Sequence, residues 1–147
     1  MIPEQYIRNC FPQWSQMSVR LNDMDALSHV NNALLKSYYE EARIQILQKI
    51  PEWFEDIVRK NCIILQKSVI EYHSPTLYSD IPFNCSNIVR VNASLVYVLQ
   101  AAYNSKTEQL GSIAEFMGTW FDLQKQRHTY ILSSKMLSNY FLSSSPN

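Results

Sequence analysis

Five side chains that can carry protons or form hydrogen bonds lie within ten residues near the start of the chain: Asp23, Asp25, His29, Asn31 and Asn32. The residues before them alternate like a strand and those after them repeat like a helix, so the chain changes direction there. The first turn of a helix offers unpaired backbone N–H groups and the positive end of the helix dipole. A carboxylate, an imidazole and such N–H groups could polarise a carbonyl and add a nucleophile or water to it. This segment is the candidate active site.

The element that must position this cluster is a long helix, predicted from residue 31 to residue 50. Apolar residues recur along it every four positions and a second row widens the stripe: Val30, Leu34, Tyr38, Ala42 and Ile46, with Leu35, Tyr39 and Leu47. Lys36, Glu40 and Arg43 share another face, at spacings that permit ion pairs on the helix surface. Pro51 ends the helix, and the charged residues from 52 to 60 predict a second, shorter one. We expect the long helix to be the central core element.

The remainder of the chain reads as strands. One strand is predicted before the acidic turn, at Met17 to Asn22, and four follow the helices, at Cys62 to Tyr72, Phe83 to Val91, Ser94 to Tyr103 and Ile113 to Leu123. The third of these four is almost continuously apolar, which suits a strand buried on both faces. Short connections favour an antiparallel meander. The predicted fold is α+β, one curved antiparallel sheet of about five strands wrapped around one helix. We expect a single domain over residues 1–140 and a flexible tail over 141–147.

Composition excludes several classes of function. The 147 residues include 13 basic and 13 acidic side chains without a long block of either, which argues against a nucleic-acid partner. Only two glycines are present, so a Walker loop or a dinucleotide fingerprint is excluded. No apolar run approaches the ~20 residues of a membrane span, and the first residues do not resemble a signal peptide, so we expect a cytoplasmic protein. Cys10, Cys62 and Cys85 are expected to be free thiols.

The motif as a whole resembles a known family. Asp-x-Asp-Ala-x-x-His-Val-Asn-Asn, from Asp23 to Asn32, followed by Tyr-Tyr-Glu-Glu-Ala-Arg at 38–43, is similar to the hotdog-fold acyl-CoA thioesterases of the 4-hydroxybenzoyl-CoA thioesterase type. The likeness runs from about residue 18 to residue 132. It includes the segments 71–75, 78–80, 93–95 and 120–122. Ser28 stands where the family commonly has glycine, and a serine adopts positive φ less freely.

The resemblance implies an activity and its residues. The family hydrolyses acyl thioesters of CoA or of an acyl carrier protein, and it works as a homodimer, or a dimer of dimers, with active sites between subunits whose sheets join edge to edge. Its catalytic carboxylate corresponds to Asp25, and the backbone N–H that holds the thioester oxygen corresponds to Asn32. Pantetheine belongs to the substrate, so no separate cofactor is expected. No metal is expected, because the histidines lack ligand spacing and the chemistry needs none.

Each candidate residue has more than one interpretation. Asp25 could attack the thioester carbonyl, activate water, or only cap a turn. His29 could orient Asp25, hold the water, protonate the leaving thiolate, or be structural. Asn31 and Asn32 are expected to cap the helix, which would also fix the N–H groups that an oxyanion needs. Asp23 is expected to support the turn.

Contacts to the CoA phosphates are the least specific part of the assignment. The candidates by position are Ser94, Arg90, Lys125 and Arg127, and for each charged one a solvated surface role is the alternative. Two other functions remain open, a hotdog module that binds an acyl thioester or another apolar ligand without cleaving it, and a hotdog dehydratase. The dehydratases usually resemble a different, His-centred helix motif.

Overall fold

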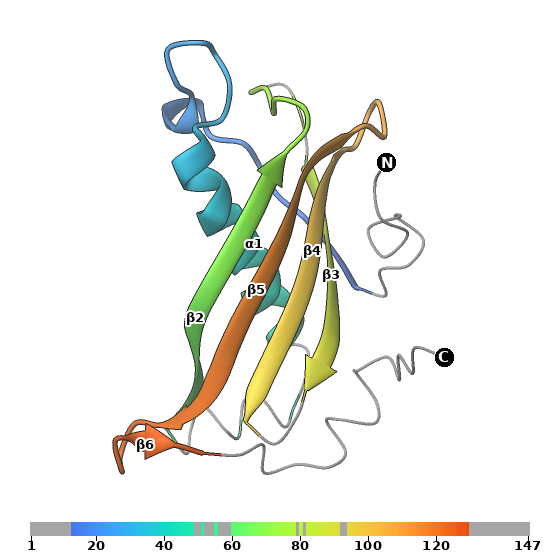
Figure 1. The fold of residues 1–147 in the computed structure, drawn as a ribbon. Helices are drawn as coiled ribbons and strands as arrows, with labels where there is room; N and C mark the ends of the chain where they lie inside the picture. The colour runs from blue at the N-terminus through green and yellow to red at the C-terminus, as the bar shows by residue number, and fades with distance from the viewer. Residues whose placement is uncertain are drawn as a thin grey trace.

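In its described residues, the chain forms one antiparallel sheet with one long helix across one face. A computed structural model of the protein describes residues 13–48, 51, 55, 60–78, 80, 82–91 and 94–129, with the backbone alone for 13–14, 46–47 and 82–91. The elements are β1 (Gln13–Gln16), the 3-10 helix η3 (Leu21–Asp23), α1 (Asn32–Leu47), β2 (Asn61–Tyr72), β3 (Pro82–Val91), β4 (Leu95–Asn104), β5 (Leu110–Asp122) and β6 (Arg127–His128). In Figure 1, α1 lies behind the sheet and crosses its strands diagonally. The predicted α+β hotdog fold is confirmed.

The strand order differs from a simple meander. The order is β1-β3-β4-β5-β2, with β6 paired to β5. β3, β4 and β5 do form a meander, but β2 pairs with β5 from Asn61↔Asp122 to Tyr72↔Ser112 and so lies at the edge of the sheet. The meander predicted for all four later strands is therefore wrong for β2. The connection after β2 crosses the end of the sheet before β3 begins.

The first strand is also displaced from its predicted position. β1 covers Gln13–Gln16, whereas the predicted segment, Met17 to Asn22, contains no strand and ends in η3. The alternation of Met17, Val19 and Leu21 suggested a strand, but Asp23 N–H donates to the Arg20 carbonyl oxygen at 3.0 Å and the chain turns. The predicted second helix falls mostly outside the described residues, and so does the predicted tail at 141–147.

The apolar stripe of α1 packs on the sheet as its spacing predicts. Val30, Leu35, Tyr38, Tyr39 and Ala42 are all buried. One core cluster joins the helix to the sheet, and its buried members are Tyr39, Val96, Val98, Ala102, Ala114, Phe116 and Trp120. Alternate residues of β4 point to the opposite face, where Leu99, Ala101 and Tyr103 form a second buried cluster with Leu110 and Ile113. β4 is therefore buried on both faces, as its apolar run predicts.

Two further features bear on the expected setting of the protein. Among the described residues, no helix has the length and apolar character required to cross a membrane. Cys62, on β2, is a half-buried free thiol whose pKa is raised by burial. Cys10 and the side chain of Cys85 lie outside the described part of the chain.

Candidate functional site

The carboxylate of Asp25 is held inside a tight backbone turn. Its Oδ1 accepts hydrogen bonds from the N–H groups of Leu27, at 2.8 Å, and His29, at 3.1 Å. The Asp25 N–H donates to the His29 carbonyl oxygen at 2.7 Å, and the Ser28 N–H donates to the Asp25 carbonyl oxygen at 3.1 Å. Asp25 does cap a turn, but capping uses only one of its two oxygens. Oδ2 accepts no hydrogen bond from the described residues.

Ser28 adopts the backbone conformation for which glycine is best suited. Its φ is +61°, in the left-handed region that L-residues other than Asn and Asp rarely enter. The loop thus places Ser28 in a conformation that a glycine would adopt without steric cost. The hydrogen bonds on either side of it, made by Asp25 and His29, hold the strained residue in place.

Asn31 is the N-cap of α1, as predicted. Its side-chain Oδ1 accepts a hydrogen bond from the Ala33 N–H at 2.9 Å, and its carbonyl oxygen accepts from the Leu34 N–H at 2.8 Å. These contacts satisfy the second and third N–H groups of the helix. The N–H of Asn32, the first helical residue, donates to no acceptor within the described residues. Capping thus leaves one donor open in the first turn, and it belongs to the residue expected to hold the thioester oxygen.

The loop that follows β2 braces this turn from the other side. The Val30 N–H donates to the Thr76 carbonyl oxygen at 2.8 Å, and His29 forms an isolated antiparallel bridge with Leu77. The Leu77 N–H in turn donates to Oδ2 of the buried Asp80 at 2.8 Å. Sequence reasoning did not find this brace, because the contacts between the loop and the turn are made by backbone groups, which leave no residue-type signal.

Tyr72, at the end of β2, also reaches the start of α1. Its hydroxyl donates to the Asn32 carbonyl oxygen at 3.3 Å, and its side chain is 48% exposed. The half-buried imidazole of His29 makes no hydrogen bond or ion pair with the described residues. The partly exposed ring of Tyr72 thus lies beside Asn32, whose N–H is the candidate oxyanion donor.

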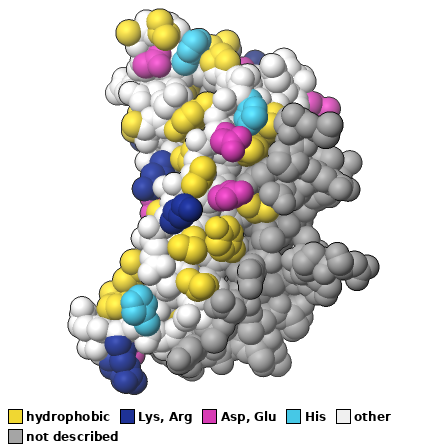
Figure 2. Space-filling model, viewed as in Figure 1, with side chains coloured by type: hydrophobic (Ala, Val, Ile, Leu, Met, Phe, Trp, Pro, Cys, Tyr) yellow, Lys and Arg dark blue, Asp and Glu magenta, His cyan; other side chains and the backbone are white. Residues whose placement is uncertain are grey.

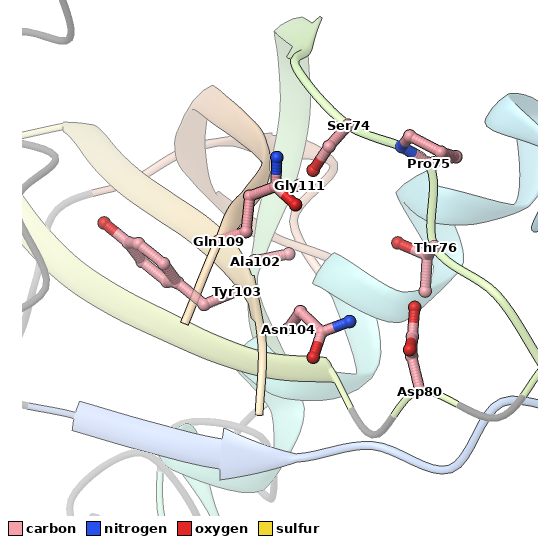
Figure 3. A pocket seen from close by; sticks show the side chains of 9 residues that line it. All are labelled: Ser74, Pro75, Thr76, Asp80, Ala102, Tyr103, Asn104, Gln109 and Gly111. Atoms are coloured by element: carbon pink, nitrogen blue, oxygen red, sulfur yellow. The ribbon is translucent and has the colours of Figure 1, made fainter. Parts of the chain in front are cut away.

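A small pocket lies behind the bracing loop. Its volume is about 20 Å³, enough for roughly one water molecule. Figure 3 shows the residues that line it, among them Thr76 and Asp80 from the loop, Asn104 at the end of β4 and Gly111 at the start of β5. The loop is fastened there, because the N–H groups of His73 and Ser74 donate to the Gly111 carbonyl oxygen at 2.8 and 3.0 Å. A pocket of this size is part of the support of the loop, since an acyl group would not fit.

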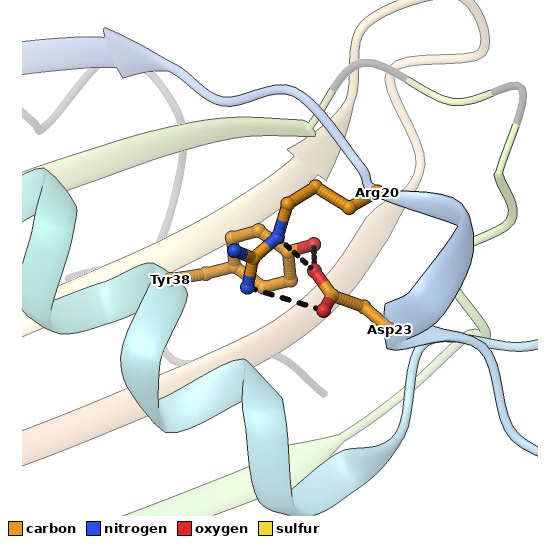
Figure 4. Close-up of polar contacts among 3 residues, drawn as sticks. All are labelled: Arg20, Asp23 and Tyr38. Carbon is orange, nitrogen blue, oxygen red and sulfur yellow. Dashed lines mark hydrogen bonds and ion pairs between the residues drawn. The ribbon is translucent and has the colours of Figure 1, made fainter.

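Asp23 lies in a polar network next to the Asp25 turn. Its buried carboxylate accepts hydrogen bonds from Arg20 Nε at 3.0 Å and Nη2 at 3.1 Å, and from the Tyr38 hydroxyl (Figure 4). The hydrogen bond from Arg20, followed by that from Tyr38, lowers the pKa of Asp23 below its usual 3.8. Burial and the contact with Asp23 raise the pKa of Tyr38. Asp23 is therefore a carboxylate and Tyr38 a phenol at neutral pH, and Asp23 supports the turn as expected.

Arg43 is not the helix-surface residue that its spacing suggests. Its Nη1 donates to Gln100 Oε1 at 2.7 Å, and its guanidinium carbon lies 4.0 Å from the centre of the Phe116 ring. Burial lowers its pKa to about 10, so it stays charged at neutral pH. The signal in the sequence was Gln100, a single polar residue in an apolar strand that needs a buried partner.

The proposed CoA contacts lie far from the Asp25 turn within one chain. Tyr72 marks the site end of β2, and Asn61, eleven residues earlier, pairs with Asp122 at the other end. A strand of that length spans about 36 Å. Lys125 and Arg127 follow Asp122, while Ser94 precedes β4 at the same end of the sheet (Figure 1). The backbone of Arg90 pairs with that of Tyr97 near that end, and the Arg90 side chain lies outside the described part of the structure. These four residues would meet an Asp25 site only through a second copy of the chain.

Metal ligands do not gather in the described part of the chain. Among those residues, no three His, Cys, Asp or Glu side chains lie close enough together to hold a metal ion. The prediction that the chemistry needs no metal remains a prediction.

Comparison with known proteins gives the family. Residues 19–137 match the model of the thioesterase-like superfamily, and this range includes the Asp25 turn, α1 and the whole of β2 to β6. The chain belongs to the thioesterase-like superfamily. No curated protein matches it.

Solved structures show the same fold as this thioesterase-like chain. A thioesterase from Thermus thermophilus, solved with coenzyme A and Zn, is 26% identical, with a TM-score of 0.69 over 82% of this chain and 85% of that one. YbaW of Escherichia coli, named a probable thioesterase, is 23% identical, with a TM-score of 0.74 over 80% and 89%. A 1,4-dihydroxy-2-naphthoyl-CoA thioesterase from Synechocystis is 17% identical, with a TM-score of 0.71 over 81% and 88%. The last two support the fold alone.

Proposed function

We propose that this thioesterase-like protein hydrolyses an acyl-CoA, or the matching acyl-carrier-protein thioester, to a free acid and a thiol without a metal ion. One observation carries the proposal: the chain presents the open oxygen of Asp25 and the open N–H of Asn32 at the two ends of one short, braced turn. Membership of the superfamily and the likeness to a thioesterase solved with coenzyme A support a CoA thioester as substrate.

The residues have distinct roles in the proposed reaction. The Asn32 N–H, at the positive end of α1, donates to the thioester oxygen and stabilises the charge that develops there. Asp25 Oδ2 either activates a water molecule or attacks the carbonyl carbon to give a mixed anhydride that water then cleaves. The C–S bond breaks, and His29 supplies a proton to the leaving thiolate. Asn31 holds the first turn of the helix in place through its cap.

The same proposal includes a homodimer through the edge of β2. This strand is twelve residues long, and among the described strands it pairs with β5 alone. Four apolar residues on it, Ile64, Leu65, Val69 and Tyr72, are each 39% exposed or more. In Figure 2, hydrophobic and charged side chains are mixed over β2 and β5. A long, partly apolar edge strand is a template for pairing with another chain. Pairing there would bring a second subunit close to Tyr72 and the start of α1, and it is the arrangement in which Ser94, Arg90, Lys125 or Arg127 of a neighbouring chain could contact CoA.

The activity is tested with the full chain and a panel of acyl-CoAs. The panel increases in acyl length and includes aromatic members such as 4-hydroxybenzoyl-CoA, and a thiol reagent detects the released CoA. We expect turnover of at least one member, unchanged by EDTA, and a loss of about 10²–10⁴-fold in kcat for Asp25→Asn. Asp122→Asn is the control for turn capping and is compared on kcat alone, because Asp122 Oδ1 also caps a turn through the N–H groups of Gln124 and Lys125, and Lys125 is itself a candidate CoA contact.

Each alternative has its own outcome. Ligand-dependent melting shifts with no thiol release across the panel would favour the non-catalytic binding module. Full activity of Asp25→Asn would show that the carboxylate is only a turn cap. Loss of activity in EDTA, restored by Zn²⁺, would show that a metal takes part.

A further inference from the structure

We propose that Asp23 is a positioning residue, which through Tyr38 sets the Asp25 turn against the N-terminus of α1. The inference rests on the proposed function for its kinetic consequence, but its structural part can be measured without turnover. It concerns two residues that the proposed chemistry does not use directly.

Asp23 makes contacts on both sides of the site. Its carbonyl oxygen accepts a hydrogen bond from the N–H of Asn31, the N-cap of α1, at 2.9 Å. Its carboxylate accepts one from the hydroxyl of Tyr38, two turns into the same helix. The backbone bond fixes where the helix starts, and the side-chain bond fixes how the helix body lies relative to the turn. Because Asp23 is attached to the helix at two points, the helix cannot rotate freely about either contact.

The position of Asp23 in the chain gives these contacts their importance. Asp25 is two residues away, and Met24 between them forms an isolated bridge with Val30. Any movement of Asp23 is therefore transmitted to Asp25 on one side and to Asn31 and Asn32 on the other. A displacement of about 1 Å between a nucleophile and an oxyanion donor can lower a rate about 100-fold.

The carboxylate and the phenol of this network are both buried. Asp23 is 5% exposed and Tyr38 is 8% exposed. Arg20, the third member, has a side chain that is 75% exposed, and its Nε lies 3.0 Å from Asp23 Oδ2. Tyr38 alone links the carboxylate to the helix, so its hydroxyl is the contact to remove.

The neighbouring tyrosine provides a matched control. The Tyr39 hydroxyl forms a 2.7 Å hydrogen bond with Ser112 Oγ, and Tyr39 is 1% exposed. Tyr38→Phe and Tyr39→Phe each remove one hydroxyl from a buried hydrogen bond on α1. Only Tyr38 reaches the turn, so a general loss of helix packing would affect both variants alike, whereas a loss of positioning would affect only Tyr38→Phe.

The experiment combines kinetics with amide hydrogen exchange on the full chain. With the best acyl-CoA of the panel, we expect Tyr38→Phe to lower kcat about 10- to 100-fold with KM changed less than about threefold. Tyr39→Phe should keep kcat within about twofold, although both variants melt a few degrees lower. Exchange of the Asn31 and His29 amides should accelerate in Tyr38→Phe and not in Tyr39→Phe, while the β4 and β5 amides stay protected in both.

The outcomes separate this inference from the proposed function. If Tyr38→Phe matches Tyr39→Phe in both kcat and amide exchange, the positioning role is overturned even in an active thioesterase. If the wild-type chain hydrolyses no member of the panel, the proposed function fails. The positioning role is then tested by the amide-exchange data alone. Acceleration confined to the turn in Tyr38→Phe would then support the positioning role, and unchanged exchange would overturn it.

Discussion

At the scale of single residues, the site depends on backbone groups as much as on side chains. Asp25 is useful because two N–H groups hold one of its oxygens and leave the other open. Asn32 contributes an N–H that stays open because Asn31 caps the one after it. The sequence showed which residues could react, since carboxylates, amides and imidazoles are recognisable by type. It could not show which oxygen or which N–H remains open, because that depends on the turn geometry.

Ser28 gives the first residue-scale prediction. Because its φ is +61°, replacing it by glycine removes a steric cost of about 1–2 kcal/mol, which the greater freedom of glycine in the unfolded chain partly offsets. We expect Ser28→Gly to raise the free energy of unfolding by about 0.5–1 kcal/mol, measured by urea denaturation, with kcat retained.

Ser18→Gly is the control for this variant. Ser18 is exposed and is not among the residues with positive φ, so the same change there should be neutral or destabilising. Equal effects at positions 18 and 28 would mean that the left-handed conformation of Ser28 costs nothing measurable.

At the scale of elements, β2 and β5 lie unusually close together at Gly118. A Cβ added to Gly118 would lie 2.4 Å from Ile63 Cγ2 and 3.0 Å from the Ile64 carbonyl oxygen. The pairing of the two strands also shifts register here, between Leu65 and Lys67. Glycine is therefore required at this position for space, and its φ is not positive.

Gly118→Ala tests this element-scale fit. We expect the free energy of unfolding to fall by about 2 kcal/mol, because either Ile63 or the β2 backbone must move. At the other glycine, Gly111, the nearest atom to an added Cβ is the Ala102 carbonyl oxygen at 3.3 Å, so Gly111→Ala should cost less. Thermal and urea unfolding measure both variants, and the reverse order of stability would contradict the close approach between β2 and β5.

The elements also show what could be predicted from sequence and what could not. α1 was predictable because its apolar repeat and its cap are local signals, and it begins one residue from its expected start. The position of β1 was missed because the alternation of Met17, Val19 and Leu21 has the strand period while the Arg20–Asp23 contact turns the chain. The edge position of β2 was missed because strand pairing across the sheet is decided by partners that are distant in sequence.

At the scale of the whole molecule, the proposed homodimer makes a testable use of the edge that β2 forms among the described strands. We expect the wild-type chain to sediment as a dimer and Val69→Lys to shift it towards the monomer. Val69 is 41% exposed on β2, and a lysine there would place like charges against each other and favour an unpaired edge. Analytical ultracentrifugation over a range of concentrations measures the shift.

Thr107→Lys adds the same charge in the exposed β4–β5 turn and serves as the control. If the proposed dimer completes the site, acyl-CoA turnover should fall in Val69→Lys in parallel with the dimer fraction. A wild-type monomer, or a Val69→Lys protein that remains dimeric, would place the interface elsewhere.

The brace formed by the loop after β2 has a consequence for the order of folding. The Val30 N–H donates to the Thr76 carbonyl oxygen, and His73 and Ser74, which begin that loop, donate to the Gly111 carbonyl oxygen. The residues proposed to do the chemistry are thus synthesised early, yet their supports arrive much later in the chain. Contacts so distant in sequence slow folding, because the intervening chain must be ordered first. The site should be among the last regions to become native, and a nascent chain that has not yet reached β5 should be unable to cleave the thioesters around it.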